Sequence, residues 1–262
     1  MRLRFLGTGT SFGIPVVGCD CATCTSGDPR DRRTRHSALL ESDDGDRRVL
    51  IDTPPDLRQQ LLAAGVSSID AVWYTHDHAD HTHGIDDLRV FSVRRRQHLP
   101  AFADPVTALS LRRKFHYIFD SDYQPPEGTS KPEIALTEFR ADDVVDVAGF
   151  TMHAIEVPHG DTRVYGFRSG GLGYITDAKT IPDHARDILR GVPVLVLNAL
   201  WFGHPHPTHF NVEEAVAMAR DLGAGRTFLT HLTHRLRHDT LAAALPPDVR
   251  PAYDGLVVAV PD

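Results

Sequence analysis

The segment AVWYTHDHADHTHG, residues 71–84, joins an apolar run to a dense cluster of ionisable side chains. The run AVWY has the length and aromatic character of a buried strand, so the cluster begins where a strand is expected to end. His76 and His78 alternate as neighbours on one face of an extended chain do, and Asp80 and His81 follow as the chain turns. Imidazole and carboxylate groups together suit zinc, iron or manganese. The segment therefore predicts two adjacent pairs of metal ligands.

Three further polar side chains follow other predicted strands in the same way. His159 comes after AIEVP, Asp177 after GYIT and His231 after TFLT. Side chains at strand ends can converge on one ligand, because a rigid sheet holds them there. A site for two metal ions needs more donors than the first segment offers, and these three residues can supply them.

The motifs THDHADH, VPHGD, YITDA and LTHLTH occur in this order, and with them the chain resembles the metallo-β-lactamase superfamily of binuclear hydrolases. The resemblance spans nearly the whole chain. It implies an α/β fold, a four-layer αββα sandwich with the metal site along one edge. It also implies that His76, His78 and His159 hold one metal, that Asp80, His81 and His231 hold the other, and that Asp177 bridges both.

The remaining sequence predicts strands and helices that interleave within one continuous domain, residues 1–262. Strands are expected at RLRFLG, RRVLIDT, AVWYTH, LPAFAD, FTMHAIEVP, RVYGFRS, LGYITD, VPVLVLNAL, RTFLTH and GLVVAV. Helices are expected near residues 55–64, 84–97, 105–116, 182–190 and 212–222. Asn211 and Glu214 can form a variant of the capping box at the start of the last helix.

Composition and charge narrow the class of protein. The 262 residues are 41% hydrophobic, which is enough to bury a full core, and the formal net charge of -7 argues against general binding to long nucleic acids. No apolar run is long enough for a membrane span, and the N-terminus lacks the apolar core of a signal peptide, so we expect a cytoplasmic protein. The basic triplets at 94–96 and 112–114 are expected to be solvated surface without a role.

The segment GCDCATC, residues 18–24, predicts a second kind of metal site. It holds the three cysteines of the chain, and a disulfide there would leave an odd thiol in a small loop. A closed tetrahedral zinc site needs four donors. Cys19, Cys21 and Cys24 can supply three, and His234 is the candidate for the fourth. Such a structural zinc would pin the N-terminal loop to the C-terminal region.

The cysteine segment narrows the resemblance to one family within the superfamily. GTGTSFGIPVVGCDCATC together with LTHLTH is similar to the phosphoribosyl 1,2-cyclic phosphate phosphodiesterases of phosphonate catabolism, which carry an accessory zinc beside a binuclear centre. HPTHFNVEEA resembles that family's later loop, in which a histidine serves the substrate phosphate, here His209. The resemblance implies two divalent ions in the active site, zinc or manganese with iron as a further candidate, and a homodimer as one assembly. Residues 86–130 match no motif, and their role stays open.

The chemistry expected is hydrolysis of a small phosphodiester, cyclic ones included, by a hydroxide that bridges two cations. Such cations lower the pKa of water from about 16 towards about 7. Asp80 is expected to position the hydroxide and His209 to give the leaving group a proton. Three other functions stay open: a glyoxalase-like thioester hydrolase, a tRNA 3′-processing nuclease, and an oxidative or carrier protein of the B type in pyrroloquinoline quinone biosynthesis.

Asp52, in VLIDTPPD, also follows a predicted strand, and two roles compete for it. It can orient a ligand histidine from behind, or it can cap the helix expected to begin near PPDL. The sequence does not decide between them, and Asp52 is not among the predicted ligands.

Overall fold

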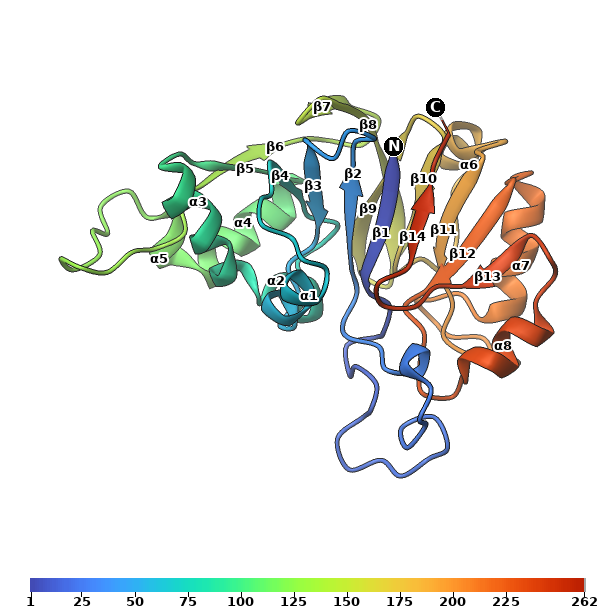
Figure 1. The fold of residues 1–262 in the computed structure, drawn as a ribbon. Helices are drawn as coiled ribbons and strands as arrows, with labels where there is room; N and C mark the ends of the chain where they lie inside the picture. The colour runs from blue at the N-terminus through green and yellow to red at the C-terminus, as the bar shows by residue number, and fades with distance from the viewer. Residues whose placement is uncertain (262) are drawn as a thin grey trace.

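A computed structural model describes residues 1–261 and places the strands in two mixed, seven-stranded sheets (Figure 1). The first sheet has the order β14 (Val257–Ala259), β1 (Arg2–Gly7), β2 (Ser37–Glu41), β3 (Arg48–Ile51), β4 (Ala71–Trp73), β5 (Leu99–Ala103) and β6 (Ile134–Glu138). The second has the order β13 (Val249–Pro251), β12 (Arg226–Thr230), β11 (Val194–Asn198), β10 (Leu172–Tyr174), β9 (Thr162–Ser169), β8 (Phe150–His159) and β7 (Val144–Val147).

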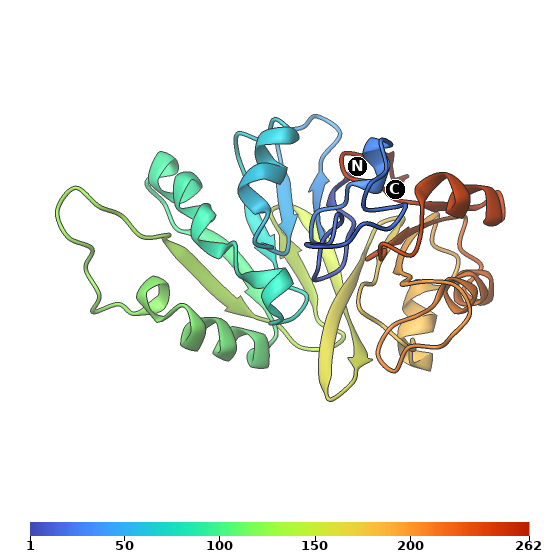
Figure 2. The same cartoon turned by 90° about the horizontal axis from the view of Figure 1, so that it is seen from below.

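Helices cover the outer faces of both sheets. Beside the first sheet are α1 (Leu57–Ala63), α2 (Ala79–Thr82), the 3₁₀ turn η2 (Ile85–Leu88), α3 (Arg89–Arg95), α4 (Pro105–Lys114) and α5 (His116–Phe119). Beside the second are α6 (Asp183–Leu189), α7 (Val212–Asp221) and α8 (His238–Ala244), and a further 3₁₀ turn, η1 (Pro29–Asp31), lies in the N-terminal loop. Figure 2 shows the green helices α3–α5 on one side of the sheets and the orange and red helices on the other.

Strand periodicity explains the layers. In β11, Val194 and Val196 face the core between the sheets, whereas Leu195 and Leu197 pack under the helices of the second sheet. In β2 the same alternation places Leu40 in the core between the sheets and Leu39 under the helices of the first sheet. The molecule thus has three hydrophobic layers between four layers of secondary structure, and the expected αββα sandwich is confirmed.

Strand direction brings the polar strand ends to one edge. Strands β3 to β6 run parallel, as do β10 to β13. Strand β8 runs in the same sense as β10, because the antiparallel β9 lies between them. The carboxyl ends of β4, β8, β10 and β12 therefore approach the same edge, beside the blue N-terminal loop in Figure 1.

Several elements differ from the sequence-based expectation. The helix expected at 84–97 begins as the turn η2 and becomes α-helical only at Arg89. Strands β2, β6, β7 and β13 and helices α2, α5 and α8 were not predicted. The capping box of α7 is confirmed, since Asn211 Oδ1 accepts from the Glu214 N–H at 2.8 Å and Glu214 Oε2 accepts from the Asn211 N–H at 3.0 Å. Among residues 1–261 no helix is long and apolar enough to cross a bilayer.

Candidate metal centre

The segment after β4 leaves the sheet before its histidines appear. Residues 74–78 lie outside any strand or helix, and α2 begins at Ala79. His76 and His81 are buried, whereas His78 is exposed at the rim. The rings of His76 and His81 lie 4.2 Å apart between centroids. The turn into α2 thus folds the second pair of predicted ligands back against the first.

The structure brings all seven predicted ligands together in overlapping groups. Within each group, the candidate ligand atoms lie within 4.8 Å of one another. One group is His76, His78, His159 and Asp177, a second is Asp80, His81 and His231, and a third is Asp177, His209 and His231. The gathering is a geometric fact, and the binding of metal by these residues stays a prediction.

Asp177 lies between the two groups. Its Oδ2 is 3.6 Å from His76 Nε2 and 3.3 Å from His81 Nε2. Its Oδ1 is 3.4 Å from His231 Nε2. The carboxylate therefore faces ligands of both proposed metals, which is the placement that a bridging ligand requires.

The backbone is constrained at this edge. Asp177 and His231 have φ values of 52° and 55°, and Asp52 has 62°, in the left-handed region that non-glycine residues seldom adopt. Such conformations cost of order 1–3 kcal/mol each and cluster at functional sites. Asp52 and His231 directly follow β3 and β12, and Asp177 follows β10 after two further residues. In each case the left-handed turn aims the side chain into the site.

Buried nitrogen atoms without partners show that the residues fit metal ions. Within residues 1–261, Nε2 of His76, His81, His209 and His231 is buried and makes no hydrogen bond. An unsatisfied buried polar atom costs about 1–3 kcal/mol. Four such atoms aimed at one carboxylate are costly as they stand, and divalent cations would satisfy their lone pairs. The nitrogen and oxygen donor set suits zinc, manganese or iron.

The charges of the cluster are strongly coupled. Burial would lower the pKa of His81, but Asp177, Asp52 and Asp80 outweigh it and raise that pKa well above its usual value. Burial would likewise raise the pKa of Asp177, but His231 and His81 hold it well below its ordinary range. A carboxylate that stays ionised at low pH is suited to bind cations.

Asp52 supports the ligands from behind. Its Oδ2 lies 2.7 Å from His81 Nδ1 and accepts from Thr75 Oγ1 at 2.8 Å. Thr75 Oγ1 is in turn 3.0 Å from His76 Nδ1, so one carboxylate orients two candidate ligands. The alternative role, capping of α1, is wrong. The N-cap residue of α1 is Asp56, and no side chain makes a capping bond there. Geometry thus settles the question that the sequence left open.

We expect Asp52→Asn to weaken metal binding about 10- to 100-fold, the range for partners that orient metal-ligating histidines. Asparagine tolerates the left-handed backbone at this position, so the change removes the charge without adding strain. Zinc retention against a competing chelator measures the effect. Asp56→Asn is the control, since that carboxylate pairs with Arg35 and contacts no ligand. Equal zinc retention in the two variants would contradict the role.

His209 reaches the centre from the loop before α7. Its Nε2 lies 3.7 Å from Asp177 Oδ2, and its ring stacks on His231 at 5.0 Å between centroids. Its Nδ1 lies 2.9 Å from Thr208 Oγ1. The carbonyl of Thr208 accepts from Nδ1 of His159 at 3.2 Å, so the loop also orients a predicted ligand. His209 is therefore within reach of a substrate held at the centre.

One buried histidine behind the site was not predicted from the sequence. His36 lies against His81 and His231, with ring centroids 5.7 and 6.1 Å away. Its Nε2 is 2.6 Å from the hydroxyl of Tyr174, and its Nδ1 is 3.0 Å from Thr230 Oγ1. No local signal marks His36, because it stands just before β2, a strand that was not predicted. His36 packs against the rings of His81 and His231 and so helps to fix their positions.

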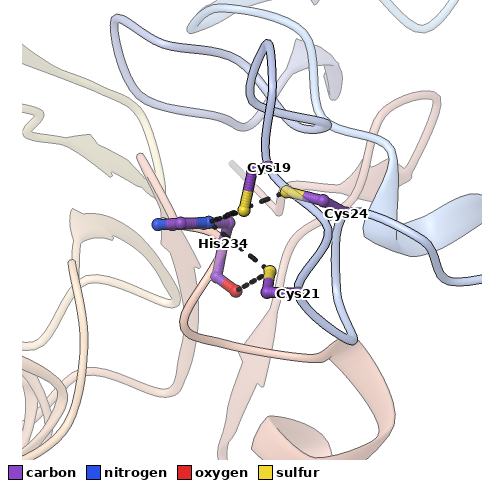
Figure 3. Close-up of side chains that lie close together, drawn as sticks. All are labelled: Cys19, Cys21, Cys24 and His234. Carbon is purple, nitrogen blue, oxygen red and sulfur yellow. Dashed lines mark hydrogen bonds between the residues drawn. The ribbon is translucent and has the colours of Figure 1, made fainter.

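The four residues predicted to hold structural zinc also meet (Figure 3). His234 Nδ1 lies 3.3, 3.5 and 3.6 Å from the sulfur atoms of Cys19, Cys21 and Cys24. The backbone N–H of Cys24 is the main cause that lowers the pKa of Cys21 to about 6, so this thiol is largely ionised at neutral pH. Burial raises the pKa of Cys24 to about 11, so its thiolate needs a cation.

The chain is similar to known proteins of one superfamily. Residues 47–232 match the family model described as Beta-lactamase superfamily domain. The crystal structure of a new diphosphatase from the PhnP family has a TM-score of 0.89 and 39% sequence identity to this chain, with 98% of this chain and 97% of that one covered.

Two other similar proteins carry different names. A protein of Porphyromonas gingivalis named octanoyltransferase is 38% identical over 257 residues, which cover 98% of this chain but 51% of that protein. The chain thus spans about half the length of that relative. Zn²⁺-bound PqqB from Methylobacterium extorquens has a TM-score of 0.79 and 20% identity, with 99% of this chain and 100% of that one covered. At this identity the likeness shows the fold alone.

Proposed function

The chain belongs to the β-lactamase superfamily and, within it, to the PhnP family, and from this we propose that it is a metal-dependent hydrolase of small phosphodiesters. The observation that carries the proposal is the gathering of nitrogen and oxygen donors on both sides of Asp177, with His209 alongside. The superfamily resemblance of the motifs is confirmed by the family match. The phosphodiester substrate is the proposed part.

The residues of the centre fit hydrolysis at phosphorus. Two divalent cations, when bound, lower the pKa of a water and stabilise negative charge on phosphoryl oxygens. Asp80, whose Oδ2 lies 3.8 Å from His231 Nε2, can accept a hydrogen bond from the attacking water and so orient it. His209 can give a proton from Nε2 to the leaving oxygen, while Thr208 holds its other nitrogen.

We expect His209→Ala to lower turnover of an alkyl phosphodiester by about 10²-fold or more, because an alkoxide leaves poorly without a proton. Metal content should be retained. The loss should shrink with an aryl leaving group, which is stable as an anion. His204→Ala in the same loop is the control, since its side chain is exposed and its backbone carbonyl, which the change keeps, accepts from Trp201 Nε1. Unchanged turnover in the His209 variant would refute its assignment.

A diphosphate ester is the second candidate substrate, favoured by the PhnP-family diphosphatase at 39% identity. Both substrates require the same attack at phosphorus and differ in the leaving group. Turnover of a cyclic phosphodiester, a linear aryl phosphodiester and a nucleoside diphosphate ester by the zinc- or manganese-loaded protein would rank them. The name octanoyltransferase belongs to a protein about twice as long, so it is not carried over to this chain.

The same assays separate the other functions considered. A glutathione thioester and a precursor tRNA test thioester hydrolysis and 3′ processing. A single iron ion with oxygen-dependent chemistry would instead favour a role like that of the pyrroloquinoline quinone protein. Hydrolysis of none of the phosphate esters would remove the proposed function.

A further inference from the structure

Helix α4 lies within residues 86–130, which match no motif, and it contacts the metal-binding segment at Asp77. Asp77 stands between His76 and His78. Its Oδ2 accepts from Ser110 Oγ at 2.5 Å and pairs with Lys114 Nζ at 2.9 Å. Lys114 Nζ also donates to the backbone carbonyl of Asp77 at 2.5 Å. Lys114 therefore does have a partner, contrary to the expectation that its basic triplet is plain solvated surface.

Helix α4 is built to hold these two side chains in place. Asp104 caps it by accepting from the N–H groups of Val106 and Thr107, and Pro105 occupies its first turn. Leu111 and Ala108 on its inner face are fully buried in the core of the first sheet. Ser110 and Lys114 are one turn apart and so project from the same face. The helix thus offers two donors from a rigid base.

The segment that carries Asp77 has no hydrogen-bonded helix or strand of its own to hold it in place. Residues 74–78 have no regular secondary structure, yet two predicted ligands of one metal flank Asp77. Holding the backbone carbonyl and the carboxylate of one residue from the same helix restricts the dihedral angles on either side of it. An exposed ion pair by itself contributes about 0–1 kcal/mol, so stability is not the main expected effect.

We propose that α4 is a positioning element of the metal centre, in which Ser110 and Lys114 hold Asp77 and thereby fix the spacing of His76 and His78. The inference rests on the proposed metal-dependent function. It assigns a role to α4, which lies within residues 86–130, the region that matches no motif. Asp77 and Lys114 are positioning residues, because neither belongs to a group of candidate ligands.

Zinc binding tests the inference without any substrate. Zinc per chain is counted at rising chelator concentration for the parent, Lys114→Met and Ser110→Ala. We expect the chelator concentration that removes the two active-site ions to fall about tenfold, at the low end of the range for residues that support metal ligands. Lys114→Arg, which keeps the charge and the donors, should restore most of the affinity. The unfolding temperature of the metal-free protein should stay nearly unchanged.

Arg112→Met is the matched control. Arg112 lies on the same helix and pairs with Glu138 of β6 at 2.7 Å, with similar exposure, but does not contact the metal-binding segment. Zinc affinity should be unchanged in this variant. Equal losses in Arg112→Met and Lys114→Met, or no loss in Lys114→Met, would overturn the inference. A parent that holds no zinc beyond the cysteine site would overturn the inference and the proposed function together. A parent that binds zinc but hydrolyses no phosphate ester would overturn the function alone.

Discussion

Asp177→Asn should lose active-site metal and with it most of the activity. Asp177 is 2% exposed and faces imidazoles from both ligand groups, so its charge would hold both of the proposed cations. Removing one partner of a buried charge pair costs about 3–5 kcal/mol, which is roughly 10²- to 10⁴-fold in metal affinity. Turnover at limiting metal should fall at least as far. Zinc content and the metal dependence of turnover measure both effects.

Asparagine is the informative replacement at this position. The backbone of residue 177 is left-handed, with φ at 52°, and asparagine tolerates that region whereas alanine would add strain. The variant therefore isolates the loss of charge. Asp161→Asn is the control, an exposed aspartate in the turn after β8. Retention of two active-site metals at parental affinity would contradict a bridging role.

The residues that gather at the candidate centre could be predicted from the sequence because strand ends leave a local signature. An apolar run followed by a polar residue is visible without knowing where the strand lies, as for Asp177 after GYIT. The layered fold was predictable for the same reason, since alternating and apolar runs report burial. The local pattern does not predict how far apart two such residues lie in the folded chain. The meeting of Asp177 with His231 depends on the order of β10, β11 and β12.

The residues that support the site carry no such signature. Asp52 has two plausible environments in sequence, and only the 2.7 Å contact with His81 chooses between them. His36 precedes β2, a strand that is buried at all five positions, where alternation disappears. Lys114 belongs to a basic run that is usually solvated, and its bond to Asp77 joins residues 37 apart. Such roles depend on tertiary contacts that no local pattern encodes.

The second largest effect is expected from loss of the cysteine cluster, and this effect should fall on stability. It joins the N-terminal loop to a residue more than 200 positions away, as a disulfide would. Loss of one such cross-link typically costs about 2–5 kcal/mol. Zinc bound to small peptides is worth about 10–16 kcal/mol, but the loop has a second anchor that limits the loss. Buried Arg33 donates to the carbonyls of Thr233 and Leu236 and pairs with Asp31.

Cys21→Ser should therefore lose one zinc per chain and unfold at a temperature roughly 5–20 °C lower, given about 2–4 °C per kcal/mol for a chain near this size. Because Arg33 still holds the base of the loop, opening should be local: amide exchange should rise in residues 10–28 before the sheets exchange. The active-site ions should be held less tightly as well, since His234 follows His231 by three residues. Asp20→Asn, an exposed change between two of the cysteines, should alter none of these readouts. If Cys21→Ser kept its zinc and its unfolding temperature, the cluster would be three idle thiols beside a histidine, and the loop would owe its shape to Arg33 alone.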